Sequence, residues 1–269
     1  MDAIMDTPVG RAAVSVVLCI QDEGIQWLST ELKKLCGHEE AGNRRVACFL
    51  MDRFAAEAGG DYSEQVPMLL KELINRLADG DATARTQGWR ALKSLVAKVT
   101  PAGMMPHLSF ARQCLSNLVS EAKHSRAAVF VDGEFVLPGF CVKGGLDCLL
   151  PLFSTAVLNG SADQREIAGN AIGDMLTVTT SEALAPYSKK LPGPLIRAAN
   201  EKFPGHVKQA LLRTLTIAID KEIVAKHFIP QLQSTFVKGL NDVTSAVRDQ
   251  AATALGKLLA MKVAVRVDP

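Results

Sequence analysis

Few residues in this sequence combine the types and the spacing that catalysis or metal binding requires. The six cysteines and five histidines are scattered, and no two cysteines form a CxxC pair. His124, Cys141 and Cys148 come nearest to a ligand set, but they lack the close spacing of the nitrogen and sulfur ligands that hold zinc. Cys141 could be a reactive thiol, although a small buried residue that anchors a loop is the commoner role.

Catalytic motifs are also absent from the sequence. It contains no HExxH, no GxSxG, no Gly-rich phosphate loop and no EF-hand. No stretch assembles a nucleophile with a base and an oxyanion site. We therefore predict that the chain is not an enzyme and that it uses no metal, cofactor or small-molecule substrate.

Basic residues in the last third of the chain are better candidates for binding. They include Arg197, Lys208, Arg213 and Lys257, which we predict to contact a partner. Such a patch could meet an acidic protein surface or ribosomal RNA, and a merely solvated face explains it as well. The net charge of +2 is too small to indicate nucleic acid by itself.

The elements that must position these residues are short paired helices, seen most clearly at 230–261. Leu232, Phe236 and Leu240 are spaced four residues apart and fall on one helical face. A second apolar stripe has a 3.6-residue period. Its members are Val247, Ala251, Ala254, Leu255 and Leu258. Neither helix can bury its stripe alone, so this unit requires similar neighbours.

Similar units recur along the chain. They start near residues 26, 67, 147, 190 and 230, so the steps are about 40 residues with one doubled gap. Repeats of roughly 40–47 residues built from paired helices are typical of HEAT and armadillo solenoids. The proline that opens the first helix, the Asp in the turn and the Val-Arg that opens the second helix favour HEAT.

We therefore predict an all-α HEAT-repeat α-solenoid, a single array of stacked antiparallel helix pairs over 1–269. The predicted repeats are 1–25 (partial), 26–60, 61–100, 101–145, 146–180, 181–222 and 223–262. Residues 263–269 end without a polar cap, which indicates a fragment of a longer array.

One repeat departs from the pattern near 124–145. Asp132-Gly133 and Gly144-Gly145 interrupt the expected second helix, and the apolar residues around Phe130 prefer strands. We predict a long ordered loop here, with a short hairpin. Long loops in compact solenoids are commonly functional or fill space in the packing.

A turn Asp or Asn precedes an arginine by six residues in three repeats. The pairs are Asp79 with Arg85, Asn159 with Arg165, and Asp242 with Arg248. We interpret these residues as a structural ladder, paired within or between neighbouring repeats, that sets the stagger of the stack.

The sequence shows no signal peptide, and its longest apolar run, 12–20, is too short to span a bilayer. The cysteines mostly occupy helix-stripe positions, as small core residues do. We expect a reduced, cytoplasmic protein that does not insert into a membrane.

Several stretches are more specific than helical periodicity. They are DYSEQVP, LPGFCVKGGLDCLLPLF, SEALAPYSKKLPGPLIRAANEKF, HVKQALLRTL and FIPQLQSTFVKGLNDVTSAVRDQAATALGKLL, and they cover most of residues 38–269. In these stretches the chain resembles the C-terminal third of the general control non-derepressible translational activators, giant cytosolic HEAT-repeat proteins. The PGFC loop and the GPLIR segment carry most of the resemblance.

The resemblance implies a non-catalytic scaffold that is associated with ribosomes or polysomes. That family binds the RWD domain of the kinase that phosphorylates initiation factor two alpha in amino-acid starvation, and it helps uncharged tRNA to activate the kinase. A basic residue matters for the kinase contact in the family, and Arg197 in GPLIR is the first candidate here, with Arg213 and Arg248 behind it. The alternative is another HEAT adaptor, of the transport-receptor or phosphatase-scaffold type, which would have no reason to carry PGFC and GPLIR.

Overall fold

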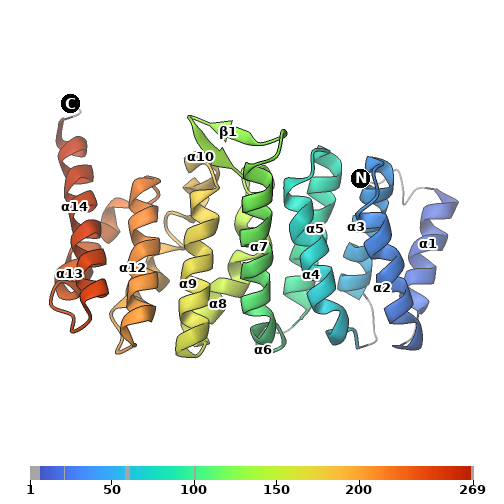
Figure 1. Ribbon diagram of the computed structural model, residues 1–269, viewed down its shortest axis with the longest axis horizontal. Coiled ribbons are helices and arrows are strands. Elements are labelled where there is room, and N and C mark those ends of the chain that lie inside the picture. Colours follow the sequence, from blue (N-terminus) through green and yellow to red (C-terminus); the bar gives the residue numbers. More distant parts are fainter. Residues whose placement is uncertain (1–6, 21, 58–60, 100, 268–269) are drawn as a thin grey trace. The chain divides into compact units, whose positions relative to one another are not determined.

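The computed structural model describes residues 7–20, 22–57, 61–99 and 101–267, and most of them are helical. The chain divides into two compact units, each with its own helix pairs (Figure 1). The N-terminal unit comprises Met1–Val129, Leu137–Gly139 and Asp147–Leu149, and the C-terminal unit comprises Phe130–Val136, Phe140–Leu146 and Leu150–Pro269. The predicted all-α fold of paired HEAT-type helices is confirmed.

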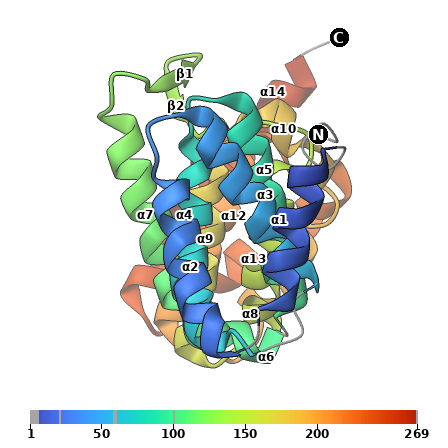
Figure 2. The same cartoon turned by 90° about the vertical axis from the view of Figure 1, so that its right-hand side faces the viewer.

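The N-terminal unit is built from two layers of helices. Its helices are α1 (Pro8–Cys19), α2 (Asp22–Cys36), α3 (Ala41–Glu57), α4 (Val66–Asn75), α5 (Ala82–Lys98), α6 (Pro101–Met104) and α7 (Leu108–Lys123). Helix α4 packs on α2 and α7, and α3 packs on α1 and α5, so α2, α4 and α7 form one layer and α1, α3 and α5 the other (Figure 2). The numbering of complete and partial repeats along the chain stays a prediction.

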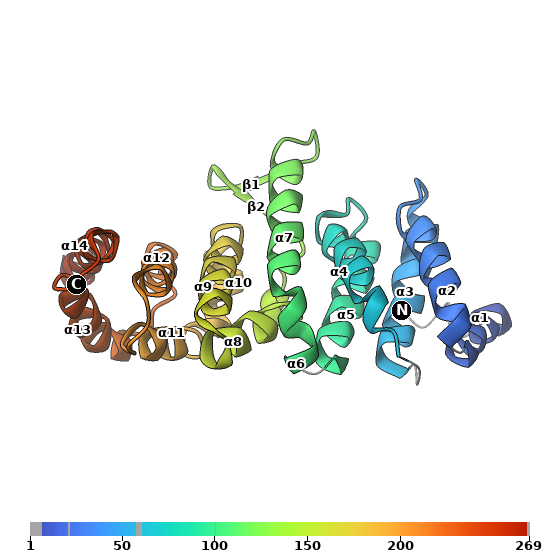
Figure 3. The same cartoon turned by 60° about the horizontal axis from the view of Figure 1, so that its bottom comes forward.

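The C-terminal unit repeats this arrangement. Its helices are α8 (Leu150–Asn159), α9 (Ala162–Thr177), α10 (Ser181–Leu184), α11 (Pro192–Ala199), α12 (Gly205–Asp220), α13 (Ile229–Gly239) and α14 (Ser245–Val267). Helices α8, α11 and α13 lie in one layer, and α9, α12 and α14 lie in the other (Figure 3). Helices α8, α11 and α13 therefore each pack against the second helix of their own repeat and against the equivalent helix of an adjacent repeat.

The apolar stripes predicted for 230–261 do form the contact between α13 and α14. Leu232 and Phe236 of α13 are fully buried. Val247, Ala251, Ala254 and Leu258 of α14 are also fully buried. Full burial of a Leu or Phe side chain stabilises the folded state by about 1.5–3 kcal/mol. A lone helix pair would leave part of this apolar surface in water, so it needs neighbouring pairs to cover it.

Local sequence sets where the helices begin. The Ser161 Oγ accepts a hydrogen bond from the Gln164 backbone N–H at 3.3 Å, and the Gln164 side chain accepts one from the Ser161 N–H at 2.9 Å, so the predicted capping box is confirmed. Asp81 caps α5 by accepting from the Ala84 N–H at 2.7 Å. Proline occupies the first turn of α4, α11 and α13, where its missing N–H costs nothing.

The irregular stretch near 124–145 contains a hairpin, as predicted. Strands β1 (Val129–Val131) and β2 (Glu134–Val136) pair across a two-residue turn in which Asp132 has φ 50° and Gly133 has φ 80°. Both residues are left-handed, as a type I′ hairpin turn requires. The Lys221 Nζ, just after α12, binds the Glu134 carboxylate at 2.5 Å, so this ion pair within the C-terminal unit holds β2 to the end of α12.

Two helix boundaries differ from prediction. Helix α2 begins at Asp22 rather than near residue 26, because Ile25 is buried and extends the stripe that runs through Leu28 and Leu32. Helix α14 continues to Val267, past the predicted repeat end at 262. Over the described residues, no helix is both long and apolar enough to cross a membrane.

Candidate protein-interaction surface

Arg197 is presented by the short helix α11. Leu195, Ile196, Ala198 and Ala199 of this helix are buried, so Arg197 is the residue that faces solvent between them. Its side chain is 80% exposed, and its Nε lies 3.8 Å from the Glu201 Oε1, one turn later. An exposed ion pair at this distance stabilises the helix by only about 0.3–0.5 kcal/mol, so the guanidinium can exchange it for another carboxylate at little cost.

The other predicted contact residues already hold carboxylates of neighbouring repeats. Arg213 on α12 donates from Nη2 to the Asp174 Oδ1 at 3.2 Å and from Nη1 to the Asn170 Oδ1 at 3.3 Å, both on α9. The Lys257 Nζ on α14 binds the carboxylate of Asp220 on α12. These two residues therefore link successive helices of the second layer.

Lys208 makes a third link between repeats. Its Nζ lies 2.7 Å from the Oδ2 of Asp242, which stands in the turn between α13 and α14. The bond from Lys208 and the backbone N–H of Thr244 lower the pKa of Asp242. The link repeats in the N-terminal unit, where Arg44 binds Asp79, 35 residues later.

Asp79 is the most enclosed of these carboxylates. It accepts from the Arg44 Nε at 2.8 Å, the Arg44 Nη2 at 2.9 Å and the Arg76 Nη1 at 2.7 Å, while its side chain is only 2% exposed. Burial alone would raise the pKa of Asp79. The bonds from Arg44 and from the Asp81 backbone N–H, with the charge of Arg76, outweigh burial and lower this pKa.

The arginines of the predicted ladder bind backbone carbonyls instead of the Asp or Asn side chain six residues earlier. Arg85 donates to the Asp79 carbonyl at 2.5 Å. Arg248 donates to the carbonyls of Asp242 and Val243 at 2.9 and 3.0 Å. Each arginine therefore binds backbone carbonyls of the turn between the two helices of its repeat. The sequence pattern alone did not distinguish this bonding from side-chain pairing.

Arg165 follows the same rule in the repeat that carries Asn159. It donates to the carbonyls of Val157, Leu158 and Gly160, the last at 2.8 Å. Its guanidinium also lies 4.3 Å from the ring centroid of Phe203 in the next repeat. This cation–π contact connects Arg165 to the next repeat.

The sequence prediction missed the links of Arg44 and Lys208 to the next repeat. The signal was present as a spacing, because Arg44 precedes Asp79 by 35 residues and Lys208 precedes Asp242 by 34. A search for oppositely charged residues separated by about the length of one repeat would have found both links.

A small cavity lies at the C-terminal end of α11 in the C-terminal unit. Its volume is about 90 Å³, and its lining includes Asn200, Lys208, Thr235, Lys238 and Asp242. The Asn200 Nδ2 donates to the Thr235 Oγ1 at 2.7 Å, and the Lys238 Nζ approaches the Asn200 Oδ1 at 3.4 Å. We call the exposed surface of Arg197, Asn200, Glu201 and Lys238 the α11–α13 face.

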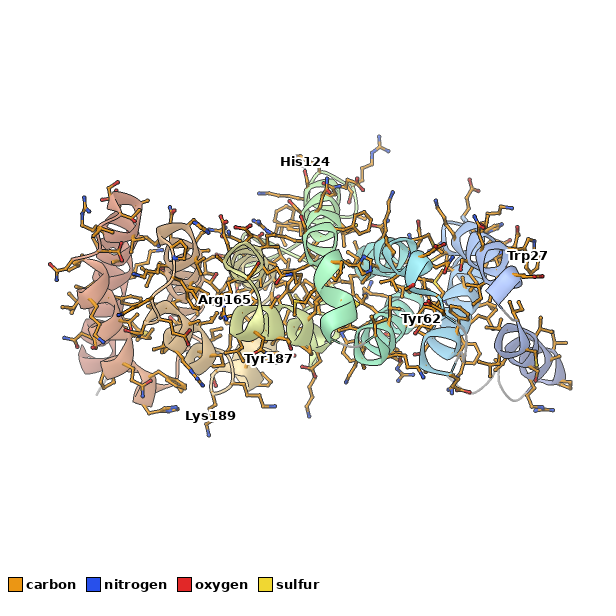
Figure 4. The ribbon with its side chains drawn as sticks, turned by 90° about the horizontal axis from the view of Figure 1, so that it is seen from below. Trp27, Tyr62, His124, Arg165, Tyr187 and Lys189 are labelled. Atoms are coloured by element: carbon orange, nitrogen blue, oxygen red, sulfur yellow. The ribbon has the colours of Figure 1, made fainter. Side chains whose placement is uncertain are left out.

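The charges around the α11–α13 face are mostly positive and solvated. Lys189 and Lys190 precede α11 and are exposed, and Figure 4 shows Lys189 pointing away from the ribbon while Tyr187 lies close to it. Lys202, after α11, is exposed too. Such a surface attracts a carboxylate-rich partner at long range.

The weak metal candidates from the sequence are not supported as a site. In the part of the chain that is described, no group of three or more His, Cys, Asp or Glu residues could hold a metal ion. His124 bonds the Ser120 carbonyl, Cys141 lies 4.0 Å from the Val178 carbonyl, and burial raises the pKa of Cys148.

Comparison with known proteins gives one consistent match. A family model described as "Stalled ribosome sensor GCN1-like, HEAT repeats" matches residues 5–144. The chain is 36% identical over 260 residues to the protein ILITYHIA of Arabidopsis thaliana and 32% identical over 258 residues to the stalled ribosome sensor GCN1 of Homo sapiens. It is 32% identical over 250 residues to the eIF-2-alpha kinase activator GCN1 of Saccharomyces cerevisiae.

These alignments cover 96%, 95% and 92% of the chain in that order. They cover 9% of each relative, so the chain spans about 9% of the length of the proteins it matches.

Proposed function

Because this chain belongs to the stalled ribosome sensor GCN1-like HEAT-repeat family, we propose that it is a non-catalytic scaffold that binds a partner protein through the α11–α13 face. The partner we propose is the RWD domain of the kinase that phosphorylates initiation factor two alpha. The relatives named as a stalled ribosome sensor and an eIF-2-alpha kinase activator support this choice. We further propose that the chain acts in the cytoplasm in association with ribosomes.

The exposure of Arg197 is the observation that carries the proposal. The other three predicted contact residues each bind a carboxylate on a neighbouring repeat, whereas the Arg197 guanidinium has a long, exposed pair with Glu201. Arginine suits a protein contact of this kind because its planar fork can bind a carboxylate through two hydrogen bonds. Lys238, an exposed residue of α13, adds a second positive charge to the same face.

The remaining candidates contribute differently in this proposal. Lys208 lines the cavity beside Asn200 and is 26% exposed, so it borders the contact while holding Asp242. Arg213 and Lys257 lie on α12 and α14, in the other helix layer, with side chains 42% and 43% exposed. We propose that these two residues chiefly set the packing between repeats.

The test is a binding measurement with the RWD domain as the probe. Calorimetry at low salt should show that Arg197→Glu weakens binding by about 1–2 kcal/mol, or about five- to thirty-fold in Kd. The affinity of the parent chain should fall as salt rises, since the attraction is between solvated charges. Lys33→Glu, an exposed lysine of α2, is the matched charge reversal and should leave the Kd unchanged.

Unfolding of each variant by circular dichroism keeps binding separate from stability. Arg197→Glu should unfold with the parent chain, because the exposed pair with Glu201 contributes little to stability. An unchanged Kd for Arg197→Glu would refute the assigned face. Failure of the parent chain to bind the RWD domain, with binding to a transport or phosphatase partner instead, would favour the other class of HEAT adaptor.

A further inference from the structure

Two buried cysteines touch each other in the N-terminal unit. Cys36 is the last residue of α2 and Cys48 lies within α3, and their Sγ atoms are 4.0 Å apart with one thiol donating to the other. Both residues are completely buried, and both are free thiols. A disulfide bond is about 2.05 Å long, so closing this gap requires a movement of about 2 Å, within reach of side-chain rotation.

A positively charged donor lies beside this pair. A Cβ atom at Gly88 would lie 2.4 Å from the Arg76 Cβ and 3.7 Å from the Cys48 Sγ, so Arg76 and Cys48 approach each other over Gly88. The Arg76 Nη1 binds the Asp79 carboxylate at 2.7 Å, but its Nε is buried and has no hydrogen-bond partner among the described residues. A buried N–H without an acceptor is costly, and the negative sulfur of a thiolate is an acceptor that would relieve the cost.

The contact shifts the pKa values of the two thiols in opposite directions. The hydrogen bond from Cys48, and after it the charge of Arg76, lower the pKa of Cys36 against the effect of burial. The same hydrogen bond and burial raise the pKa of Cys48. Since the thiolate is the reactive form, Cys36 is the thiol that reacts first.

The end of α2 offers a path for a small oxidant. Cys36 is followed directly by the exposed turn of Gly37 and His38, so opening one helical turn would bring its sulfur to solvent. Helix ends open locally at far lower cost than helix middles.

We propose that Cys36 and Cys48 are a redox-modification site that forms a reversible intramolecular disulfide on exposure to a peroxide. The Cys36 thiolate attacks one peroxide oxygen, so that an S–O bond forms, the O–O bond breaks and the departing hydroxide takes up a proton to become water. The Cys48 sulfur then attacks the Cys36 sulfur, the S–S bond forms, and the oxygen leaves as water with the proton of Cys48. In total, two thiols lose two electrons and two protons to one peroxide, which becomes two waters.

The crosslink would fasten α2 to α3 next to the bond between Arg44 and Asp79. It would therefore make one helix pair of the scaffold more resistant to unfolding under oxidising conditions, and a thiol reductant would release it. This disulfide would lie in the N-terminal unit, whereas the α11–α13 face lies in the C-terminal unit. The redox proposal therefore does not depend on the binding proposal.

The experiment treats the purified full chain with hydrogen peroxide, then alkylates the denatured chain with N-ethylmaleimide and determines its mass. The oxidised chain should carry two fewer alkyl groups than the six of the reduced chain. Trypsin without reduction should yield residues 35–44 joined to residues 46–53, and these peptides should separate after reduction. The joined peptides should form several-fold faster in the folded chain than in concentrated urea.

Three variants make the test specific. Cys36→Ser and Cys48→Ala should each abolish the joined peptides, whereas Cys114→Ser, which removes another buried thiol, should leave them at parent yield. The parent chain itself gives the mass and peptide readouts, so the test does not depend on whether a variant folds. Four results would overturn the proposal: six alkylated cysteines after peroxide, a sulfinic acid at Cys36 with Cys48 still alkylated, peptides joined elsewhere, or equal rates of joining in the folded and urea-unfolded chain.

Discussion

Removing the carboxylate of Asp79 is the most informative perturbation of the stability of the N-terminal unit. Asp79→Ala leaves Arg44 and Arg76 without the oxygen atoms that accept three of their N–H groups. Breaking a buried ion pair costs about 3–5 kcal/mol because the remaining charge stays desolvated. The side chains of Arg44 and Arg76 are 15% and 17% exposed, so water replaces part of the lost bonding. We expect a loss of about 3 kcal/mol in the free energy of unfolding, the lower end of that range.

The assay is urea unfolding followed by circular dichroism, with amide hydrogen exchange to locate the loss. Exchange should accelerate in α3, α4 and α5, the helices that surround Asp79, and stay at parent rates in the C-terminal unit. Glu31→Ala is the matched control, because it removes an exposed carboxylate that pairs with Lys34 in the same unit, and it should cost less than about 0.5 kcal/mol.

A double-mutant cycle identifies the origin of the effect. Asp79→Ala combined with Arg44→Ala should show a coupling of about 1–3 kcal/mol, since the two side chains share two hydrogen bonds. A loss for Asp79→Ala no larger than that of Glu31→Ala, or a coupling near zero, would refute the view that this contact holds successive repeats together.

Three further predictions address the caps, a close backbone approach and acid stability. Arg248→Ala should destabilise the C-terminal unit by about 1 kcal/mol in urea unfolding, because it removes two hydrogen bonds to carbonyls of the turn between α13 and α14. Unchanged stability with weaker partner binding would make Arg248 a contact residue. Gly139→Ala should cost about 2 kcal/mol or more in the thermal unfolding of the N-terminal unit, since its Cβ would lie 2.7 Å from the Leu77 carbonyl oxygen; parent-like melting would contradict this. Folding lowers the pKa values of Asp79 and Asp242, so their ionised carboxylates stabilise the fold at pH values above the ordinary aspartate pKa of about 3.9. This stabilisation is lost as the pH falls through the lower folded-state pKa values. Asp79→Asn should therefore flatten the pH dependence of the free energy of unfolding below about pH 4.

The sequence determined which stretches form helices, and most of the helix ends, because those depend on residues only a few positions apart. The period of the apolar stripe at 230–261 set which faces of α13 and α14 are buried. Ser161 and Gln164 marked the start of α9 through bonds that span three residues, and Asp132-Gly133 marked the hairpin turn through their backbone preferences.

Only the tertiary structure decided which charged groups meet. Arg85, six residues after Asp79, binds only the Asp79 backbone carbonyl. Arg44 reaches the Asp79 carboxylate from the preceding repeat because α3 packs against α5. The packing of α12 on α9 likewise brings Arg213 to Asp174. Arg213 therefore differs in role from the exposed Arg197, although both arginines belong to one basic stretch. The contact between Cys36 and Cys48 likewise follows from the way α2 and α3 pack, because side-chain positions across a helix pair are set by the whole buried surface rather than by neighbours in the sequence.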